Sequence, residues 1–280
     1  MARPRLIPCF VVVLVVIAGS LFAADKSSGK FAFGKVHFEP VDALAYQEPD
    51  KDGKPLTFVA LTNFKIDRAD VMDAINTAGA LIGQAAKTET GAIVMLRVTS
   101  PDKCGLAGFL SQTQQQIDLG DSFPAKSTLT AGRVAGECST NKPGKMFDDV
   151  YEFHLTYDAP LTVIPKPNAL SAGGGEPGTV YSALVKAIQA ADWNVAHLHL
   201  PEREIPQTKP KAADMKEYFH GLALNYPKTV TVTGGLMKGP RANLDIRGTD
   251  NDGKKIKGVV AMKKDAAEWR VVDQTLFFEE

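Results

Sequence analysis

The sequence predicts an α+β protein, in which a β-rich N-terminal domain with one main helix precedes helices packed on a curved antiparallel sheet. Three observations indicate this fold class. Apolar and polar residues alternate along 229–278, which is typical of antiparallel strands with one buried face. Apolar residues recur at helical spacing in three other segments. A run rich in proline and glycine separates the two parts of the chain.

Length and composition agree with two globular domains. A chain of 280 residues has room for roughly two domains, and 44% hydrophobic residues can supply a core to each. Lys+Arg and Asp+Glu are both 32, so the net charge is zero. Without a basic excess or a long Lys/Arg run, we expect no nucleic-acid partner.

Residues 1–24 resemble a secretory signal peptide. Arg3 and Arg5 precede a short apolar run at 9–18, and small residues ending in Ala24 precede a polar stretch. The alternative is an uncleaved anchor, but the run is shorter than the ~20 residues of a membrane-spanning helix. No second apolar stretch approaches that length. We therefore expect a soluble mature protein, periplasmic or secreted, with no stable membrane span after signal cleavage.

Two cysteines remain after the signal segment. In an oxidising compartment, Cys104 and Cys138 are expected to form a disulfide. The alternatives are a metal site or two free thiols. Neither cysteine has a CxxC partner or a nearby histidine, so the metal alternative has little support.

The β-rich domain is expected over 25–160, with Cys104 in a long irregular loop at 100–124. Asp67 can cap a helix whose apolar residues lie at helical spacing from Val71 to Ala85. Alternating or continuously apolar runs predict the strands, at 31–38, 41–46, 56–61, 92–98, 127–130, 133–138 and 150–157.

A Pro/Gly linker at 161–178 is expected to lead into an α+β domain at 179–280. Helical spacing begins at Tyr181, a second short helix is expected at 193–200, and a third around 215–222 stops before Pro227. The strands of the following meander are separated by turns at 250–253 and 264–265.

The C-terminal domain resembles small nuclear-transport-factor-2-like domains. The resemblance is carried by Y-S-A-L-V-K-A-I-Q-A-A-D-W at 181–193, T-V-T-G-G at 231–235 and E-W-R-V-V-D at 268–273, and it covers about 177–280. It implies an α+β cone with a pocket between helices and sheet, and a buried Trp269. Such domains include binding modules, protein-association modules and a few enzymes, so the resemblance leaves function open.

The pocket that the resemblance implies would be lined from the helices. A ligand pocket is expected to use Tyr181, Trp193, His197, Tyr218 and His220, together with Leu184 and Phe219. The alternative is that these aromatic residues belong to the core, which is the commoner role for aromatic residues on a helix face.

Motifs for catalysis or metal binding are lacking. Residues i and i+2 of a helix point in different directions, so His197 and His199 are not expected to share a metal ion. The two Asp-x-Asp-Gly turns resemble calcium loops, but Val59 and Val259 occupy the position that needs a carboxylate. No nucleophile elbow or phosphate-binding glycine motif occurs. We expect no metal and no cofactor.

Three hypotheses remain. The first is an exported, non-catalytic two-domain protein that binds a small ligand or another protein. The second is an enzyme that uses His197 or His220 as acid or base in the C-terminal pocket. The third is an envelope assembly protein, whose exposed sheet face would pair with a partner protein.

Overall fold

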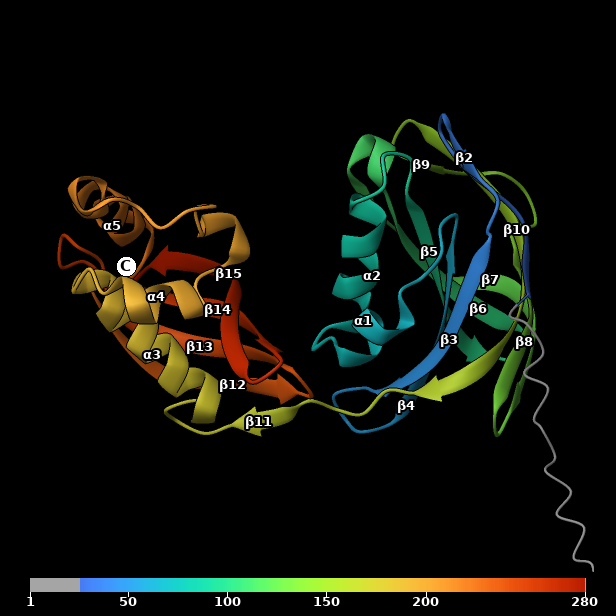
Figure 1. Cartoon of the computed structure of the whole chain (residues 1–280). Coiled ribbons are helices and arrows are strands. Elements are labelled where there is room, and N and C mark those ends of the chain that lie inside the picture. Colours follow the sequence, from blue (N-terminus) through green and yellow to red (C-terminus); the bar gives the residue numbers. More distant parts are fainter. Residues whose placement is uncertain (1–25, 280) are drawn as a thin grey trace, which may run out of the picture.

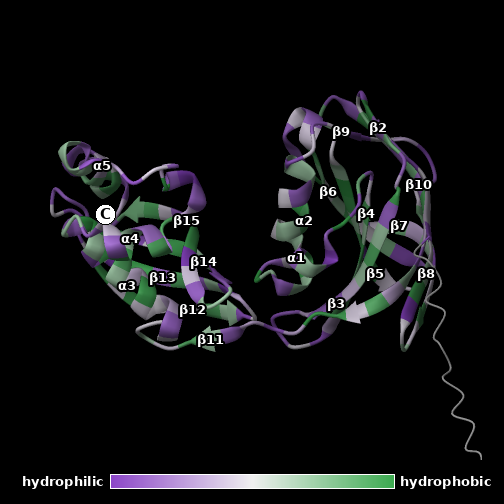
Figure 2. Cartoon of the chain, viewed as in Figure 1, coloured by the Kyte–Doolittle hydropathy of each residue, from purple (hydrophilic) through white to green (hydrophobic). Residues whose placement is uncertain are grey.

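The computed structural model describes residues 26–279, and the predicted signal segment lies outside them. Within this range the predicted mixture of α and β structure is confirmed: two large, mainly antiparallel sheets are accompanied by few helices (Figure 1). Bands of hydrophobic and hydrophilic residues run along the strands of both sheets (Figure 2), as alternating inward and outward side chains require.

The first sheet closes into a barrel. Strand β10 pairs with β8 on one side and, on the other, with β1 and then in parallel with β3. The path from β3 through β4, β5, β6 and β7 to β8 therefore returns to β10. The strands are β1 (Lys26–Phe33), β2 (Val36–Phe38), β3 (Asp42–Pro49), β4 (Pro55–Thr62), β5 (Ala92–Ser100), β6 (Lys103–Leu110), β7 (Gln115–Thr130), β8 (Arg133–Ser139), β9 (Gly144–Met146) and β10 (Asp149–Val163).

Residues 100–124 are not the irregular loop that the sequence predicted. They contain all of β6 and the first part of β7, joined by the 3-10 turn η1 (Ser111–Thr113). Glycine, aspartate and proline, which recur in this segment, are depleted in strands, and this is why the sequence pattern missed these strands. Gly108 serves close packing instead, because a Cβ there would lie 2.5 Å from the carbonyl oxygen of Ile93 on β5.

The disulfide partners lie inside the barrel. Cys104 is on β6 and Cys138 on β8, both are fully buried, and their Cα atoms are 6.4 Å apart with the sulfurs at bonding distance. This geometry agrees with the predicted pairing. Cys104 is therefore a strand residue of the core, and the cross-link connects two strands across β7.

The single predicted helix is two short helices, α1 (Arg68–Asp73) and α2 (Thr77–Ala86). The Asp67 carboxylate accepts from the amide of Asp70 at 3.1 Å, so the predicted cap is confirmed. Asn76 caps the second helix in the same way, accepting from the Gly79 amide at 2.9 Å. Both helices pack outside the barrel, on an apolar cluster that includes Leu81 and Ile93.

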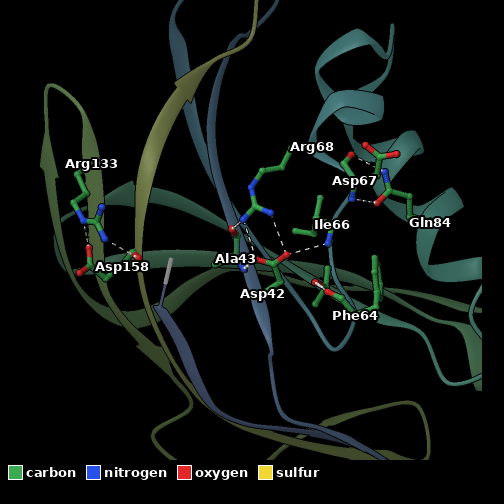
Figure 3. A network of polar contacts seen from close by, with 10 residues as sticks. Asp42, Ala43, Phe64, Ile66, Asp67, Arg68, Gln84, Arg133 and Asp158 are labelled. Atoms are coloured by element: carbon green, nitrogen blue, oxygen red, sulfur yellow. Dashed lines mark hydrogen bonds and ion pairs between the residues drawn. The ribbon is translucent and has the colours of Figure 1, made fainter. Parts of the chain in front are cut away.

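A polar network fixes the chain where it enters these helices (Figure 3). Asp42 at the start of β3 is buried and accepts from the backbone amides of Ala43 and Ile66 at 2.9 and 3.0 Å. The Arg68 guanidinium donates to both oxygens of the same carboxylate, at 2.9 and 3.1 Å. The Asp42 carboxylate therefore holds β3, the β4–α1 connection and α1 together.

Helices cover one face of the second sheet. The sheet order is β11 (Asn168–Leu170), β12 (Thr229–Lys238), β13 (Arg241–Thr249), β14 (Lys255–Asp265) and β15 (Glu268–Phe278). The helices are α3 (Gly175–Gln189), α4 (Trp193–His199) and α5 (Ala212–Asn225), with the 3-10 turn η2 (Glu202–Glu204) between the last two. Their apolar side chains form one core with Leu244, Val260, Trp269 and other strand residues.

Much of the predicted linker at 161–178 is structured. Residues 161–163 belong to β10, Ile164 is buried against α1 and α2, and 168–170 form β11. Helix α3 then begins at Gly175, after Gly174 with φ of 66°. A Cβ at Gly174 would lie 2.7 Å from Val232 Cγ1, so this tight entry requires glycine. Between the two sheets, the segment without regular structure is 164–167.

Candidate functional site

A hollow of about 570 Å³ lies between the end of α5, the turn η2 and the ends of β14 and β15. We call it the C-terminal hollow. Ligand pockets are typically 300–1,000 Å³, largely apolar, and carry a few convergent polar groups. Its lining includes the side chains of Arg203, Glu204, Leu224, Tyr226, Gln274 and Phe278.

A β-bulge brings the end of β15 into this hollow. Met262 is opposite Val271 and Ala261 is opposite Asp273, so Val272 is the extra residue. Before the bulge, Trp269 and Val271 face the core. After it, the residues opposite the buried core positions of β14 are Gln274, Leu276 and Phe278. The bulge therefore places one amide and two apolar side chains on the helix-covered face.

The floor of the hollow contains a buried tyrosine paired with a carboxylate. The Tyr226 hydroxyl donates to Glu204 Oε2 at 3.0 Å. Burial raises the pKa of Tyr226 far above its usual range, and the Glu204 carboxylate raises it further. Tyr226 is therefore a neutral hydrogen-bond donor. Arg203 from the same turn donates to the carbonyl of Val272 at 3.1 Å and pairs with Asp273 at 3.0 Å.

A second polar contact joins the floor to the helices. The Tyr181 hydroxyl donates to Gln274 Oε1 at 2.9 Å, and Gln274 Nε2 donates to the carbonyl of Asn225 at 2.8 Å. Burial also raises the pKa of Tyr181, so that its proton stays on the hydroxyl. One amide on the sheet thus bridges α3 and the end of α5 beneath the hollow.

Apolar side chains form the rim. Leu224 and Phe278 are 69% and 67% exposed and lie at one edge of the hollow. The Lys254 ammonium lies 5.7 Å from the Phe278 ring centroid. Two acidic residues, Glu204 and Asp250, are among the lining residues. The hollow thus combines an apolar rim with carboxylate acceptors.

The predicted pocket residues lie outside the C-terminal hollow, but two of them contact its lining: Tyr181 through Gln274, and Tyr218, whose hydroxyl donates to the Glu204 carbonyl at 3.0 Å. Trp193 and His197 stack with ring centroids 5.3 Å apart, and Tyr218 packs edge-on against Trp193 at 5.7 Å. The His197 Nδ1 lies 2.6 Å from the Trp193 carbonyl. Tyr181 is fully buried and reaches the C-terminal hollow only through Gln274. His220 is exposed on α5.

The remaining predicted lining residues belong to the core. Leu184 is fully buried and Phe219 nearly so, both within the helix–sheet cluster. His199 is also buried, with Nδ1 2.8 Å from the Trp269 carbonyl. Within residues 26–279 no group of three or more His, Cys, Asp or Glu side chains is placed to hold a metal ion.

Sequence reasoning missed Glu204, Tyr226, Gln274 and Phe278. One signal was available: the chain ends its last strand with L-F-F, two aromatic residues where a solvent edge would favour polar ones. The inward position of Gln274 depends on the bulge, and the Glu204–Tyr226 pair depends on how η2 meets the end of α5.

No family model, no curated protein and no solved structure matches this chain. Within the part of the chain that the structure describes, no helix has both the length and the apolar composition to span a membrane.

Proposed function

We propose that this chain is an exported two-domain binding protein, and that its C-terminal domain holds a small amphipathic ligand in the C-terminal hollow. The observation that carries the proposal is the pairing of an apolar rim, Leu224, Leu276 and Phe278, with the polar floor formed by Tyr226, Glu204 and Gln274. The buried disulfide supports export, because such cross-links persist in oxidising compartments.

The polarity of the floor favours a ligand whose head is cationic or donates hydrogen bonds. Arg203 is already engaged by Asp273 and a backbone carbonyl, whereas Glu204 uses one oxygen for Tyr226. The second oxygen of Glu204 and the carboxylate of Asp250 can then accept from a ligand. An apolar ligand body would lie on Leu224 and Phe278.

The nuclear-transport-factor-2-like architecture remains part of this proposal. Three helices on one face of an antiparallel sheet, with an opening at one end, support it. The catalytic alternative has less support, because His197 directs Nδ1 to a backbone carbonyl, His220 is exposed on α5, and neither lines the hollow.

A fluorescence titration tests the proposal. Dansylcadaverine, an amphipathic amine, should bind the full chain with a saturable emission increase, and the anionic probe anilinonaphthalene sulfonate should bind more weakly. Glu204→Gln keeps an acceptor for the Tyr226 hydroxyl but removes the charge, and Phe278→Ala removes rim surface. Each should weaken dansylcadaverine binding by about tenfold, the equivalent of 1.4 kcal/mol.

Phe147→Ala is the matched control, because Phe147 is 82% exposed and lies in the N-terminal domain. It should bind the probe like the wild type, and all variants should keep their melting temperature. Unchanged binding in both hollow variants, or equal losses in Phe147→Ala, would refute the assignment of the ligand to this hollow.

A further inference from the structure

A larger hollow, of about 800 Å³, lies on the outside of the barrel. It is built on β1, β2 and β10, where inward-facing Phe31, Phe38 and Phe153 belong to the barrel core. Because side chains alternate along each strand, the residues between them face outward. These are Lys30 and Ala32 on β1, His37 on β2, and Glu152 and His154 on β10. We call it the barrel hollow.

Strand register arranges these side chains in two rows. In the first row, Lys30 on β1 is opposite His154 on β10, which is opposite Ser139 on β8. Directly opposite residues have Cβ atoms about 4.5–5.5 Å apart. The first row therefore presents an ammonium, an imidazole and a hydroxyl side by side, and all three can donate to an anion.

The second row has a different character. His37 is opposite Ala32, which is opposite Glu152, and Glu39 follows His37 at the same hollow. Ala32 carries only a methyl group between longer neighbours, so it forms a low floor. The second row therefore presents one imidazole and one carboxylate, and Glu39 adds a second carboxylate beside it.

Within residues 26–279 the titratable side chains of the two rows form no direct polar contacts of their own, and His154 interacts electrostatically with Glu137 of β8. In this range, none of Lys30, His37, Glu39, Glu152 and His154 forms an ion pair or a side-chain hydrogen bond. Other charged residues on the same sheet do pair, as Lys126 does with Glu137 at 2.9 Å. Lys30 of the first row and Glu152 of the second thus face one hollow without forming an ion pair with each other.

We propose that the barrel hollow binds a short peptide with free termini, its carboxylate on Lys30 and His154 and its ammonium on Glu152. The rows are two residues apart along the strands, or about 6.8 Å. Two extended residues span about 7 Å, so a dipeptide matches this separation. The rest of the volume accommodates its side chains. This proposal is independent of the C-terminal hollow.

The two ends of the ligand make the proposal testable. Isothermal titration of the full chain with L-alanyl-L-alanine should give saturable heat. N-acetylation removes the ammonium, and C-terminal amidation removes the carboxylate. Each modification should weaken binding by about tenfold or more. Absence of saturable heat from the free dipeptide at millimolar concentrations would overturn the proposal.

Variants assign each end of the peptide to its row. Lys30→Gln should weaken binding of the free dipeptide. This variant should also bind the free dipeptide and its C-terminal amide with equal affinity. Glu152→Gln should bind the free dipeptide and the N-acetylated dipeptide with equal affinity. Lys35→Gln and Glu89→Gln change exposed residues that do not line the hollow, and both should behave like the wild type. Equal binding of the acetylated dipeptide to the wild type would show a simple anion site and refute the peptide assignment.

Discussion

The Lys238 ammonium donates a hydrogen bond of 2.9 Å to the carbonyl oxygen of Ala74. Lys238 ends β12 in the C-terminal domain, and Ala74 follows α1 on the barrel. The lysine is only 7% exposed, and burial lowers the pKa of its ammonium. Beside it, Arg241 at the start of β13 pairs with Asp70 of α1. The β12–β13 hairpin thus fastens the second domain to the helices of the first.

Breaking this contact should make the two domains more mobile relative to each other. Lys238→Met combined with Arg241→Gln removes the hydrogen bond to Ala74 and the charge pair with Asp70. Residues 164–167 connect the sheets without regular structure, so cleavage by a nonspecific protease should become faster there. Small-angle scattering should also show a larger radius of gyration. Lys257→Met, at an exposed position of β14, is the control. Unchanged cleavage and radius in the double variant would contradict a fastening role.

The Asp42–Arg68 network predicts an acid dependence of the N-terminal domain. Burial alone would raise the pKa of Asp42, but the Arg68 guanidinium and the amides of Ile66 and Ala43 outweigh it and lower the pKa below its usual value. The unfolded chain then binds the proton more readily. The stabilisation is complete above the unfolded pKa of about 3.9 and is lost as the pH falls through the folded pKa.

Asp42→Asn should therefore destabilise the barrel at pH 7. It should also make the free energy of unfolding of the barrel less dependent on pH in acid. Breaking a buried pair costs about 3–5 kcal/mol, and the partly exposed Arg68 places this case at the lower end. Urea unfolding at pH 7 and pH 3 measures both effects. Asp148→Asn is the matched control, because that carboxylate is fully exposed. If the stability of the Asp42→Asn variant fell in acid as it does in the wild type, the Asp42–Arg68 network would not account for the acid dependence.

Local patterns predicted the strands that alternate regularly and missed those that depend on partners. In β14, Ile256, Val260 and Met262 were correctly placed on one face, because nothing interrupts the period of two. In β15 the same rule holds only to Val271, since the bulge shifts every later side chain to the other face. The residues of the C-terminal hollow lie beyond that point, so their inward position could not be predicted.

The sequence pattern also did not predict that the first sheet closes into a barrel. Strand β10 was recognised only at 150–157, but it continues to Val163 and changes partner from β1 to β3. Pro160 lies within this strand, at a position paired with Arg133 of β8. Proline ordinarily marks a strand end, so the linker was placed too early. The helix break at Ala74 had a local signal, the second cap at Asn76.

The Cys104–Cys138 cross-link should stabilise the barrel. The two residues are 34 positions apart, and closing such a loop in the unfolded chain is typically worth about 2–4 kcal/mol. Replacing both cysteines by alanine should lower the urea midpoint of the N-terminal domain and leave the C-terminal domain unchanged. Adding reductant to the unfolded wild type should reproduce the shift on refolding. Equal midpoints with and without the cross-link would show that the buried pair contributes packing alone.

Trp269 lies in the core of the C-terminal domain. Its side chain is 2% exposed and packs in the cluster formed by α3, α4, α5 and the sheet. The Lys264 ammonium lies 5.8 Å from the ring centroid and donates to Glu176 of α3 at 3.0 Å. The backbone carbonyl of Trp269 also meets His199 of α4. This residue therefore connects two helices to the strand that carries the hollow.

Trp269→Ala should destabilise the C-terminal domain by about 3–5 kcal/mol, the usual cost of removing a buried tryptophan side chain. Calorimetry should show the C-terminal transition shifted to lower temperature or lost, with the barrel transition in place. Trp193→Ala is the matched control: this indole is half-buried and stacks on His197 at the helix edge, so its removal should cost less. Equal shifts in the two variants would mean that Trp269 does not connect the helices to β15 as the structure indicates.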